Sequence, residues 1–251
     1  MTPGDLPEVG VMLAECFPVS LVRYLTYAQH GVSAFLEMQL THQHLSPGSF
    51  YRVAVDAQDR AVAFAEFKMV APRTGFLSYL CVDRHARGKG VATSLMREFV
   101  DHRDLERVDL DVFEDNAPAV RLYTKLGFVE QGQNVWLRRP LPAPTIPLSL
   151  FDFPSSAAAY AAYGFCELRP QSANPALRLG RIGSRVLRCF DVSSFNDDSL
   201  LSRAKATLPD LTEVLFVAPP GSIQAVGAGA ETVAVGQRMT LGLGALGQAK
   251  S

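Results

Sequence analysis

Two glycines flanked by basic side chains form the segment of this chain with the clearest capacity for chemistry. Residues 76–82 are apolar and aromatic, which predicts a β-strand, and residues 91–96 predict the start of a helix. Between them lies the turn Arg87-Gly88-Lys89-Gly90. A glycine-rich turn before a helix leaves backbone N–H groups unpaired, and the helix dipole adds about half a positive charge there. The segment therefore predicts an anion site, and phosphate is the anion that such sites typically bind.

A second motif lies about thirty residues further along the chain. Residues 115–128 read DNAPAVRLYTKLGF, which contains an Asn-x-x-Ala step, then Leu-Tyr, then Gly-Phe. Together with the spacing Arg87-x-x-Gly90-x-Ala92, this block resembles the GCN5-related N-acetyltransferases (GNAT superfamily). In that family the first motif is the pyrophosphate loop for acetyl-CoA. The resemblance covers roughly residues 5–138.

The resemblance implies an acetyl-CoA-dependent N-acetyltransferase that acetylates a primary amine by direct attack on the bound thioester. The family's general acid matches Tyr123, and its pantetheine contact matches Asn116. A core tyrosine and a helix cap are the alternative roles of these two residues. Pantetheine is expected to run along the backbone of Leu80, Cys81 and Val82 like an added strand. The diphosphate is expected at Arg87, Gly88, Lys89, Gly90, Val91, Ala92 and Thr93.

The general base is harder to assign. Several relatives place a glutamate at the start of the central strand, but residues 73–76 read RTGF and contain no carboxylate. Glu66 on the preceding strand is the best substitute, with Tyr79, His85 or a water relay as alternatives. A solvated strand position is the other interpretation of Glu66. The missing base leaves open a second function, a catalytically silent acyl-CoA-binding module or sensor.

The elements that must position these residues follow from hydrophobic periodicity. We predict a helix at 5–16, one or two helices at 18–40 broken near Gly31, and a hairpin of strands 51–56 and 61–70. A strand at 107–113, a helix ending at Gly127 and a strand at 128–137 complete the first unit. This order predicts a mixed sheet with helices on both faces, and the resemblance identifies it as the α/β fold of GNAT acyl-CoA N-acyltransferases.

The second half of the chain predicts a separate domain. Residues 138–149 contain four prolines, so we assign residues 1–138 to the acetyl-CoA-binding domain, 139–149 to a stiff linker and 150–251 to a smaller second domain. The pattern Phe-Pro-x-Ser-x-x-x-Tyr-x-x-Tyr at 17–27 recurs at 153–163, which suggests a tandem, degenerate GNAT-like unit. Its expected elements are strands 185–192, 213–218 and 237–243 and helices 198–208 and 222–233. Asp197 and Asp198 stand where a cofactor loop would lie, and they would repel a diphosphate.

Composition limits the function classes. The 251 residues carry a net charge of -1 and 48% hydrophobic residues, which argues against binding of nucleic acid. No apolar run is long enough to span a membrane. The four cysteines are scattered and form no CxxC pair, which predicts reduced thiols, a cytoplasmic location and no metal site. The expected partners are acetyl-CoA and an amine acceptor, and we expect a monomer or a homodimer.

Overall fold

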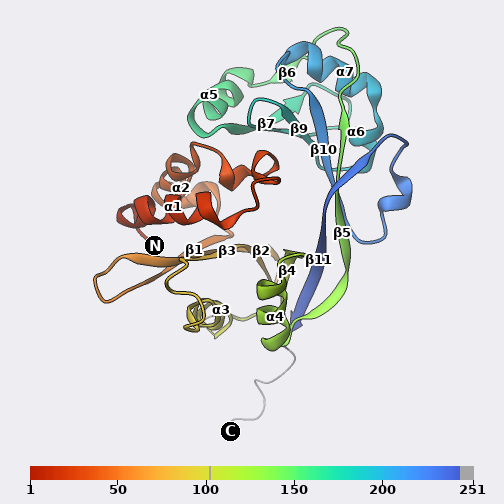
Figure 1. Cartoon of the computed structure of the whole chain (residues 1–251). Helices are drawn as coiled ribbons and strands as arrows, with labels where there is room; N and C mark the ends of the chain where they lie inside the picture. Colours follow the sequence, from red (N-terminus) through yellow and green to blue (C-terminus); the bar gives the residue numbers. More distant parts are fainter. Residues whose placement is uncertain (102, 244–251) are drawn as a thin grey trace. The chain divides into compact units, whose positions relative to one another are not determined.

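The computed structural model describes residues 1–101 and 103–243 in two compact units (Figure 1). Of the described residues, unit 1 comprises 1–16, 36–132 without 102, and 236–243, and unit 2 comprises 17–35 and 133–235. Strands β5 (Val129–Pro140) and β11 (Glu231–Gly242) contribute residues to both units.

Unit 1 is built on a mixed sheet. Its strands are β1 (Ser49–Val55), β2 (Ala61–Ala71), β3 (Thr74–Val82), β4 (Arg107–Phe113) and the last part of β11, in that order. The first three strands are antiparallel, β3 and β4 are parallel, and β4 and β11 are antiparallel. The mixed α/β sheet predicted from the sequence is confirmed.

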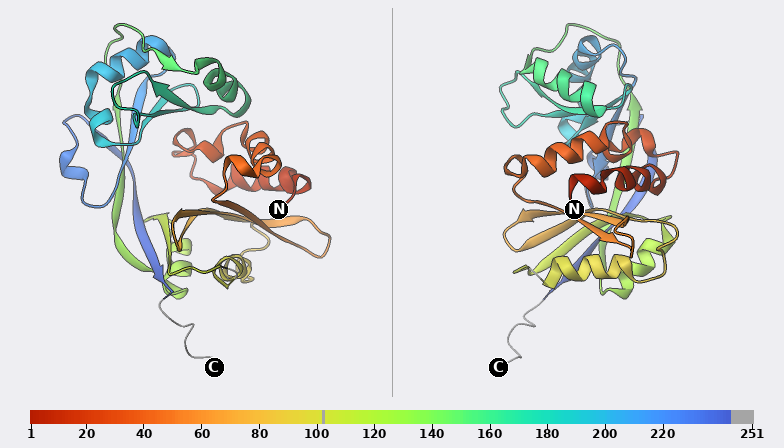
Figure 2. Two further views of the ribbon diagram at one scale, coloured as in Figure 1. Left: turned by 180° about the vertical axis from the view of Figure 1, so that it is seen from behind. Right: turned by 90° about the vertical axis from the view of Figure 1, so that its left-hand side faces the viewer.

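Helices cover both faces of the unit 1 sheet (Figure 2). Helix α1 (Leu6–Cys16), which follows the turn η1 (Pro3–Asp5), packs on β2 and β3 from one side. Helix α3 (Val91–Asp101) packs on the other side, where α4 (Ala117–Lys125) joins it in one apolar core. Helix α2 (Val32–Thr41) has residues in both units and is followed by the turn η4 (Gln43–Leu45).

Unit 2 repeats the same succession of pairings with other strands. Strands β7 (Phe165–Pro170), β8 (Leu179–Ile182) and β9 (Val186–Cys189) are antiparallel neighbours. Strand β10 (Glu213–Ala218) is parallel to β9 and antiparallel to β5. The short β6 (Leu150–Phe151) pairs with β7. The remaining elements are α5 (Phe153–Tyr163), α6 (Val192–Asn196), α7 (Asp198–Thr207) and the turns η2 (Val22–Tyr24), η3 (Thr26–Ala28) and η5 (Ile223–Ala225).

The compact units do not follow the predicted boundaries at residues 138 and 150. Residues 17–35 pack with the second half of the chain, because the apolar side chains of this segment lie against α5 and β7. The proline-rich stretch after β5 is not a free linker. Leu141 packs on the unit 2 core and Leu148 is buried in it. The backbone N–H of Leu148 donates to the Thr207 hydroxyl at 2.7 Å.

One local prediction in the second half was wrong. The helix expected at 222–233 is the short turn η5 followed by the start of β11. The two segments with matching Phe-Pro and Tyr spacing also fold differently, since 153–163 is an α-helix whereas 17–27 contains two short 3-10 turns. The side chains recur, but the local backbone does not.

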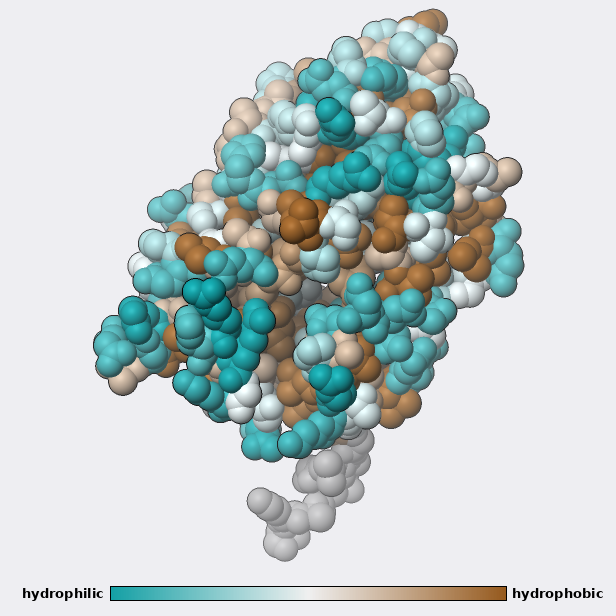
Figure 3. Space-filling view, viewed as in Figure 1, coloured by the Kyte–Doolittle hydropathy of each residue, from teal (hydrophilic) through white to brown (hydrophobic). Residues whose placement is uncertain are grey.

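The surface carries dispersed apolar groups. On the face seen in Figure 3, hydrophobic residues are interspersed with hydrophilic ones. The most exposed large apolar side chains, Val19 and Ile146, lie in segments without regular secondary structure. Within residues 1–101 and 103–243, no helix is long and apolar enough to cross a membrane.

Gly31 provides a test of how segment 17–35 packs. A Cβ atom at this position would lie 2.2 Å from the carbonyl oxygen of Ala162 and 2.3 Å from Cα of Tyr163. Both are backbone atoms, so they cannot rotate away. We expect Gly31→Ala to lower the free energy of unfolding by about 1–3 kcal/mol, measured by urea denaturation. Gly4→Ala is the control, since its Cβ makes only an ordinary contact of 3.6 Å with Thr2. Equal stabilities of the two variants would contradict this packing.

Candidate functional site

The loop between β3 and α3 has the backbone that an anion site requires. Gly88 and Gly90 have φ angles of +76° and +81°, in the left-handed region that favours glycine. A Cβ at either position would meet nothing within 4 Å, so the backbone conformation, not crowding, selects glycine. Within the described residues, the N–H groups of positions 87–93 donate no hydrogen bond. They are therefore available to a ligand at the N-terminus of α3.

Basic side chains add full charges to this loop. Arg87 turns back toward the end of β3, where its Nε donates to the carbonyl oxygen of Val82 at 3.0 Å. Lys89 is exposed and forms no ion pair within the described part of the chain. The loop thus combines unpaired amides, a helix dipole and cationic side chains, as the sequence predicted.

Strand β3 offers an open backbone edge next to this loop. It pairs with β4 from Thr74, opposite Arg107, to Leu77, opposite Leu110. Both strands continue beyond these residues without pairing to each other. At the same point the register between β2 and β3 shifts by one residue, which is a β-bulge at Ser78. An extended ligand can therefore lie along the residues that follow, where Leu80, Cys81 and Val82 stand.

Tyr123 is a buried phenol on the α3 side of the sheet. It is 6% exposed and packs edge to face on Phe128, with ring centroids 5.7 Å apart. Burial, and next the charge of Cys81, raise the pKa of Tyr123 far above its usual value of 10. The phenol is therefore protonated at neutral pH.

Asn116 has the structural role that the sequence left open. Its side-chain oxygen accepts a hydrogen bond from the N–H of Ala119 at 3.3 Å, which makes it the N-cap of α4. The same helix ends before Gly127, whose φ of +92° reverses the chain. Asn116 thus fixes the start of the helix that carries Tyr123.

Glu66 lies on the opposite face of the sheet from Tyr123. Its neighbours Ala65 and Phe67 belong to the core on the α3 side, so the alternation of the strand turns Glu66 toward the other face. There it stands in register with Tyr51 on β1 and Tyr79 on β3. Its side chain is 1% exposed, and its Oε1 lies 3.2 Å from Nζ of Lys68. It is a buried, ion-paired carboxylate and not a solvated strand residue.

The structure adds a carboxylate to this face that the sequence analysis did not single out. Asp109 on β4 is 7% exposed and alternates with core residues of the strand. Its Oδ1 accepts from the Thr240 hydroxyl at 2.7 Å, and its Oδ2 lies 3.1 Å from Nη2 of Arg107. The alternation of RVDLDVF could have placed Asp109 on this face, but its partner on β11 is 131 residues away.

The thiols of Cys16 and Cys81 interact beside the open edge. All four cysteines of the chain are free. A hydrogen bond with Cys81 is the main cause that lowers the pKa of the Cys16 thiol, and the charge of Arg87 contributes. The same hydrogen bond, with burial, raises the pKa of Cys81 well above the usual value. Elsewhere, burial raises the pKa of Cys166 to about 11 and that of Cys189 to about 12.

Within the described residues, no group of three or more His, Cys, Asp or Glu side chains could hold a metal ion.

These pKa directions predict which cysteine reacts first. The thiolate is the nucleophile, so Cys16 should be alkylated by iodoacetamide before the other three, at a pH below the usual thiol pKa. Peptide mass spectrometry measures the order. Cys81→Ala removes the hydrogen bond and should slow alkylation of Cys16, whereas Cys81→Ser keeps a donor and should not. Faster reaction of Cys166 or Cys189 would contradict the assignment.

Comparisons with known proteins show what the first half of this chain resembles. The sequence profile of the acetyltransferase (GNAT) family matches residues 12–128. An L-amino acid N-acetyltransferase of Escherichia coli is 44% identical over 57 residues, which are 21% of this chain and 35% of that protein. A mycothiol acetyltransferase of Actinosynnema mirum is 37% identical over 81 residues, 31% of this chain and 27% of that protein. The chain thus spans about a third or less of the length of these two relatives.

A solved structure supports the fold over nearly the whole chain. The crystal structure of a GCN5-related N-acetyltransferase from Sphaerobacter thermophilus has a TM-score of 0.59 and 13% sequence identity. It covers 96% of this chain and 94% of that one. The glycine loop, the open edge of β3 and the capped helix of Tyr123 all lie within the matched residues 12–128. Residues 12–128 of this chain are thus similar to the acetyltransferase (GNAT) family.

Proposed function

We propose that this protein is an acetyl-CoA-dependent N-acetyltransferase that transfers the acetyl group to a primary amine by direct attack. The observation that carries the proposal is the unpaired amide loop at residues 87–93, followed by the N-terminus of α3 and adjoining the open edge of β3. The diphosphate of acetyl-CoA binds these amides together with Arg87 and Lys89. Pantetheine then extends along Leu80–Val82, which brings the thioester to the bulge at Ser78.

Because β3 and β4 separate beyond Leu77 and Leu110, the thioester is accessible from both faces of the sheet. Tyr123 stands on the face of α3 and α4, and Glu66 stands on the other face. The amine attacks the carbonyl carbon from the Glu66 side, and the C–S bond breaks toward Tyr123. A backbone N–H of β3 polarises the carbonyl oxygen as negative charge develops on it.

Proton movement accounts for both side chains. The acceptor must lose a proton to become a neutral nucleophile, since an alkylamine has a pKa of about 10 in water. Glu66 accepts this proton, directly or through water. Tyr123 donates its proton to the departing thiolate and is reprotonated from solvent. The attacking nitrogen loses a second proton to water as the C–S bond breaks. The products are a neutral amide, free CoA and one proton released to solvent, and the balance needs no redox partner.

The acceptor is a primary amine, either of a small molecule or of a protein. The name of the Escherichia coli relative points to the amino group of an amino acid. We propose a cytoplasmic location and a monomer or homodimer. Size-exclusion chromatography with light scattering tests the oligomeric state.

A catalytically silent acyl-CoA-binding module is the second candidate. The ion pair between Glu66 and Lys68 favours it, because a carboxylate held by a cation is a weaker base. An assay of CoA release over a panel of primary amines decides between the two. Binding of acetyl-CoA without acetylation of any amine in the panel would favour the module.

We propose that unit 2 is a degenerate copy that does not bind CoA. The matching succession of strand pairings supports common origin. Two features argue against cofactor binding. Strand β9 ends at Cys189, where its pairing with β10 also ends, so it has no open edge like that of β3. Asp191 and Asp197 also accept hydrogen bonds from the N–H groups of Ser194 and Leu200, which occupies the helix entrances.

Gly90→Glu tests the cofactor loop. The carboxylate would stand at the N-terminus of α3 and repel the diphosphate, so we expect the affinity for acetyl-CoA to fall at least about tenfold in calorimetry. Gly229→Glu is the matched control, because Gly229 also has a positive φ, +86°, and open space around it but precedes no helix. Undiminished binding by Gly90→Glu would show that the diphosphate lies elsewhere.

Tyr123→Phe tests the general acid. The ring packs as before, so acetyl-CoA binding should be unchanged while kcat falls about 100-fold or more. Tyr163→Phe, on α5, is the control for loss of a phenol outside this site. A kcat equal to that of the wild type would mean that Tyr123 serves only the core.

A further inference from the structure

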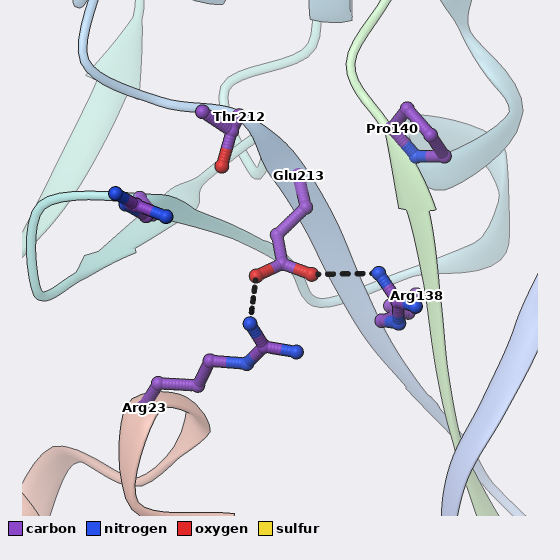
Figure 4. A pocket seen from close by; sticks show the side chains of 6 residues that line it. Arg23, Arg138, Pro140, Thr212 and Glu213 are labelled. Atoms are coloured by element: carbon purple, nitrogen blue, oxygen red, sulfur yellow. Dashed lines mark hydrogen bonds and ion pairs between the residues drawn. The ribbon is translucent and has the colours of Figure 1, made fainter.

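A small cavity in unit 2 gathers more positive than negative charge. It has a volume of about 210 Å³ and is lined by Arg23, Arg138, Pro140, Arg185, Thr212 and Glu213 (Figure 4). Arg23 comes from η2, Arg138 and Pro140 from the end of β5, and Arg185 from the residue before β9. The cavity lies where β9 and β10 begin. It is therefore at the opposite end of these strands from the helix entrances of α6 and α7.

Glu213 is a carboxylate shared by several donors. Its side chain is 7% exposed. The Tyr24 hydroxyl donates to Oε2 at 3.0 Å, and burial and the charge of Glu213 raise the pKa of Tyr24, which keeps it a donor. Nη1 of Arg138 lies 3.4 Å from Oε2, and Nη1 of Arg23 lies 3.5 Å from Oε1. Figure 4 shows both guanidinium groups directed at this carboxylate.

These ion pairs leave donors unused. Charge-assisted N–H···O bonds are typically about 2.7–2.9 Å long, so both contacts to Glu213 are loose. Each guanidinium has five N–H donors, and one carboxylate cannot satisfy two of them. Arg138 also binds Glu231 at 2.5 Å, but that side chain is 63% exposed and does not line the cavity.

Arg185 is the cavity arginine with the most unused hydrogen-bond donors. No hydrogen bond or ion pair of its side chain is found within residues 1–101 and 103–243. Its backbone is nevertheless fixed to the cavity, because its carbonyl oxygen accepts from the N–H groups of Thr212 and Glu213 at 2.8 and 3.2 Å. The lining thus holds three guanidinium groups and one carboxylate, a net charge of +2 (3 minus 1).

We propose that this cavity binds a small molecule through a dianionic oxygen group, a phosphate or a dicarboxylate. Two negative charges would balance the lining, and planar guanidinium groups match both chemistries in a bidentate manner. The volume leaves room for a group larger than the anion alone. The site is separate from the acetyl-CoA loop of unit 1 and goes beyond the proposed acetyl transfer.

Calorimetric titration of the full-length protein at constant ionic strength tests the proposal. Inorganic phosphate, succinate and acetate are the three probes. We expect saturable binding of phosphate or succinate, and which of the two binds more tightly identifies the ligand class. Acetate should bind at least about tenfold more weakly. Equal binding of acetate, or no saturable binding of either dianion, would overturn the proposal.

Two variants and one control variant locate the binding. Arg185→Gln should weaken it about tenfold or more, and Arg169→Gln, a 73% exposed arginine on β7, should leave it unchanged. Glu213→Gln should strengthen it, since the amide still accepts from Tyr24 but no longer competes for the guanidinium groups. A purely structural ion network predicts no such gain. Thermal melts show whether each variant folds. If folded Arg185→Gln binds the dianion as the wild type does, the site is refuted. This outcome does not depend on whether Glu213→Gln folds.

The Gly90→Glu variant separates this site from the cofactor loop. It should bind phosphate as the wild type does, because the loop lies in unit 1. Loss of phosphate binding in Gly90→Glu, with retention in Arg185→Gln, would place the ion at the acetyl-CoA loop. That result would overturn the cavity proposal and leave the proposed acetyltransferase function intact.

Discussion

The separation of strands β3 and β4 is the constraint on which the site in unit 1 depends. The two parallel strands share hydrogen bonds as far as Leu77 and Leu110, and the bulge at Ser78 then changes the course of β3. Backbone groups that a sheet would normally pair become available to a ligand at this point. The sheet therefore provides both the scaffold and the binding edge, and the glycine loop at its end provides the charge.

In the proposed reaction, the same separation lets residues from opposite faces of the sheet act on one thioester. Tyr123 is held in the core by Phe128 and by the helix that Asn116 caps. Glu66 is held on the other face by its register with neighbouring strands and by Lys68. If β3 and β4 stayed paired along their whole length, the backbone of the sheet would separate these two side chains. The gap beyond Leu77 and Leu110 removes that barrier.

Unit 2 has the same order of pairings but a different balance of charges. The helix entrances after β9 are closed by the aspartates that cap them, whereas the opposite ends of the strands gather arginines around Glu213. A fold thus carries ligand chemistry only where its loops leave donors unsatisfied. The loop at Gly88 and Gly90 leaves its N–H groups unpaired, whereas aspartates accept hydrogen bonds at the helix entrances after β9.

The sequence by itself determined the features that depend on neighbouring residues. The turn at Gly88 and Gly90, the strand at 107–113 and the helix that carries Tyr123 follow from local spacing and backbone preference. Only the tertiary structure decided which strands become neighbours. It placed β11 beside β4, so that Thr240 reaches Asp109, and it placed segment 17–35 in unit 2, so that Arg23 reaches Glu213. The physical reason is that strand partners and ion pairs between distant residues are selected by burial and packing of the whole chain, and local periodicity carries no record of them.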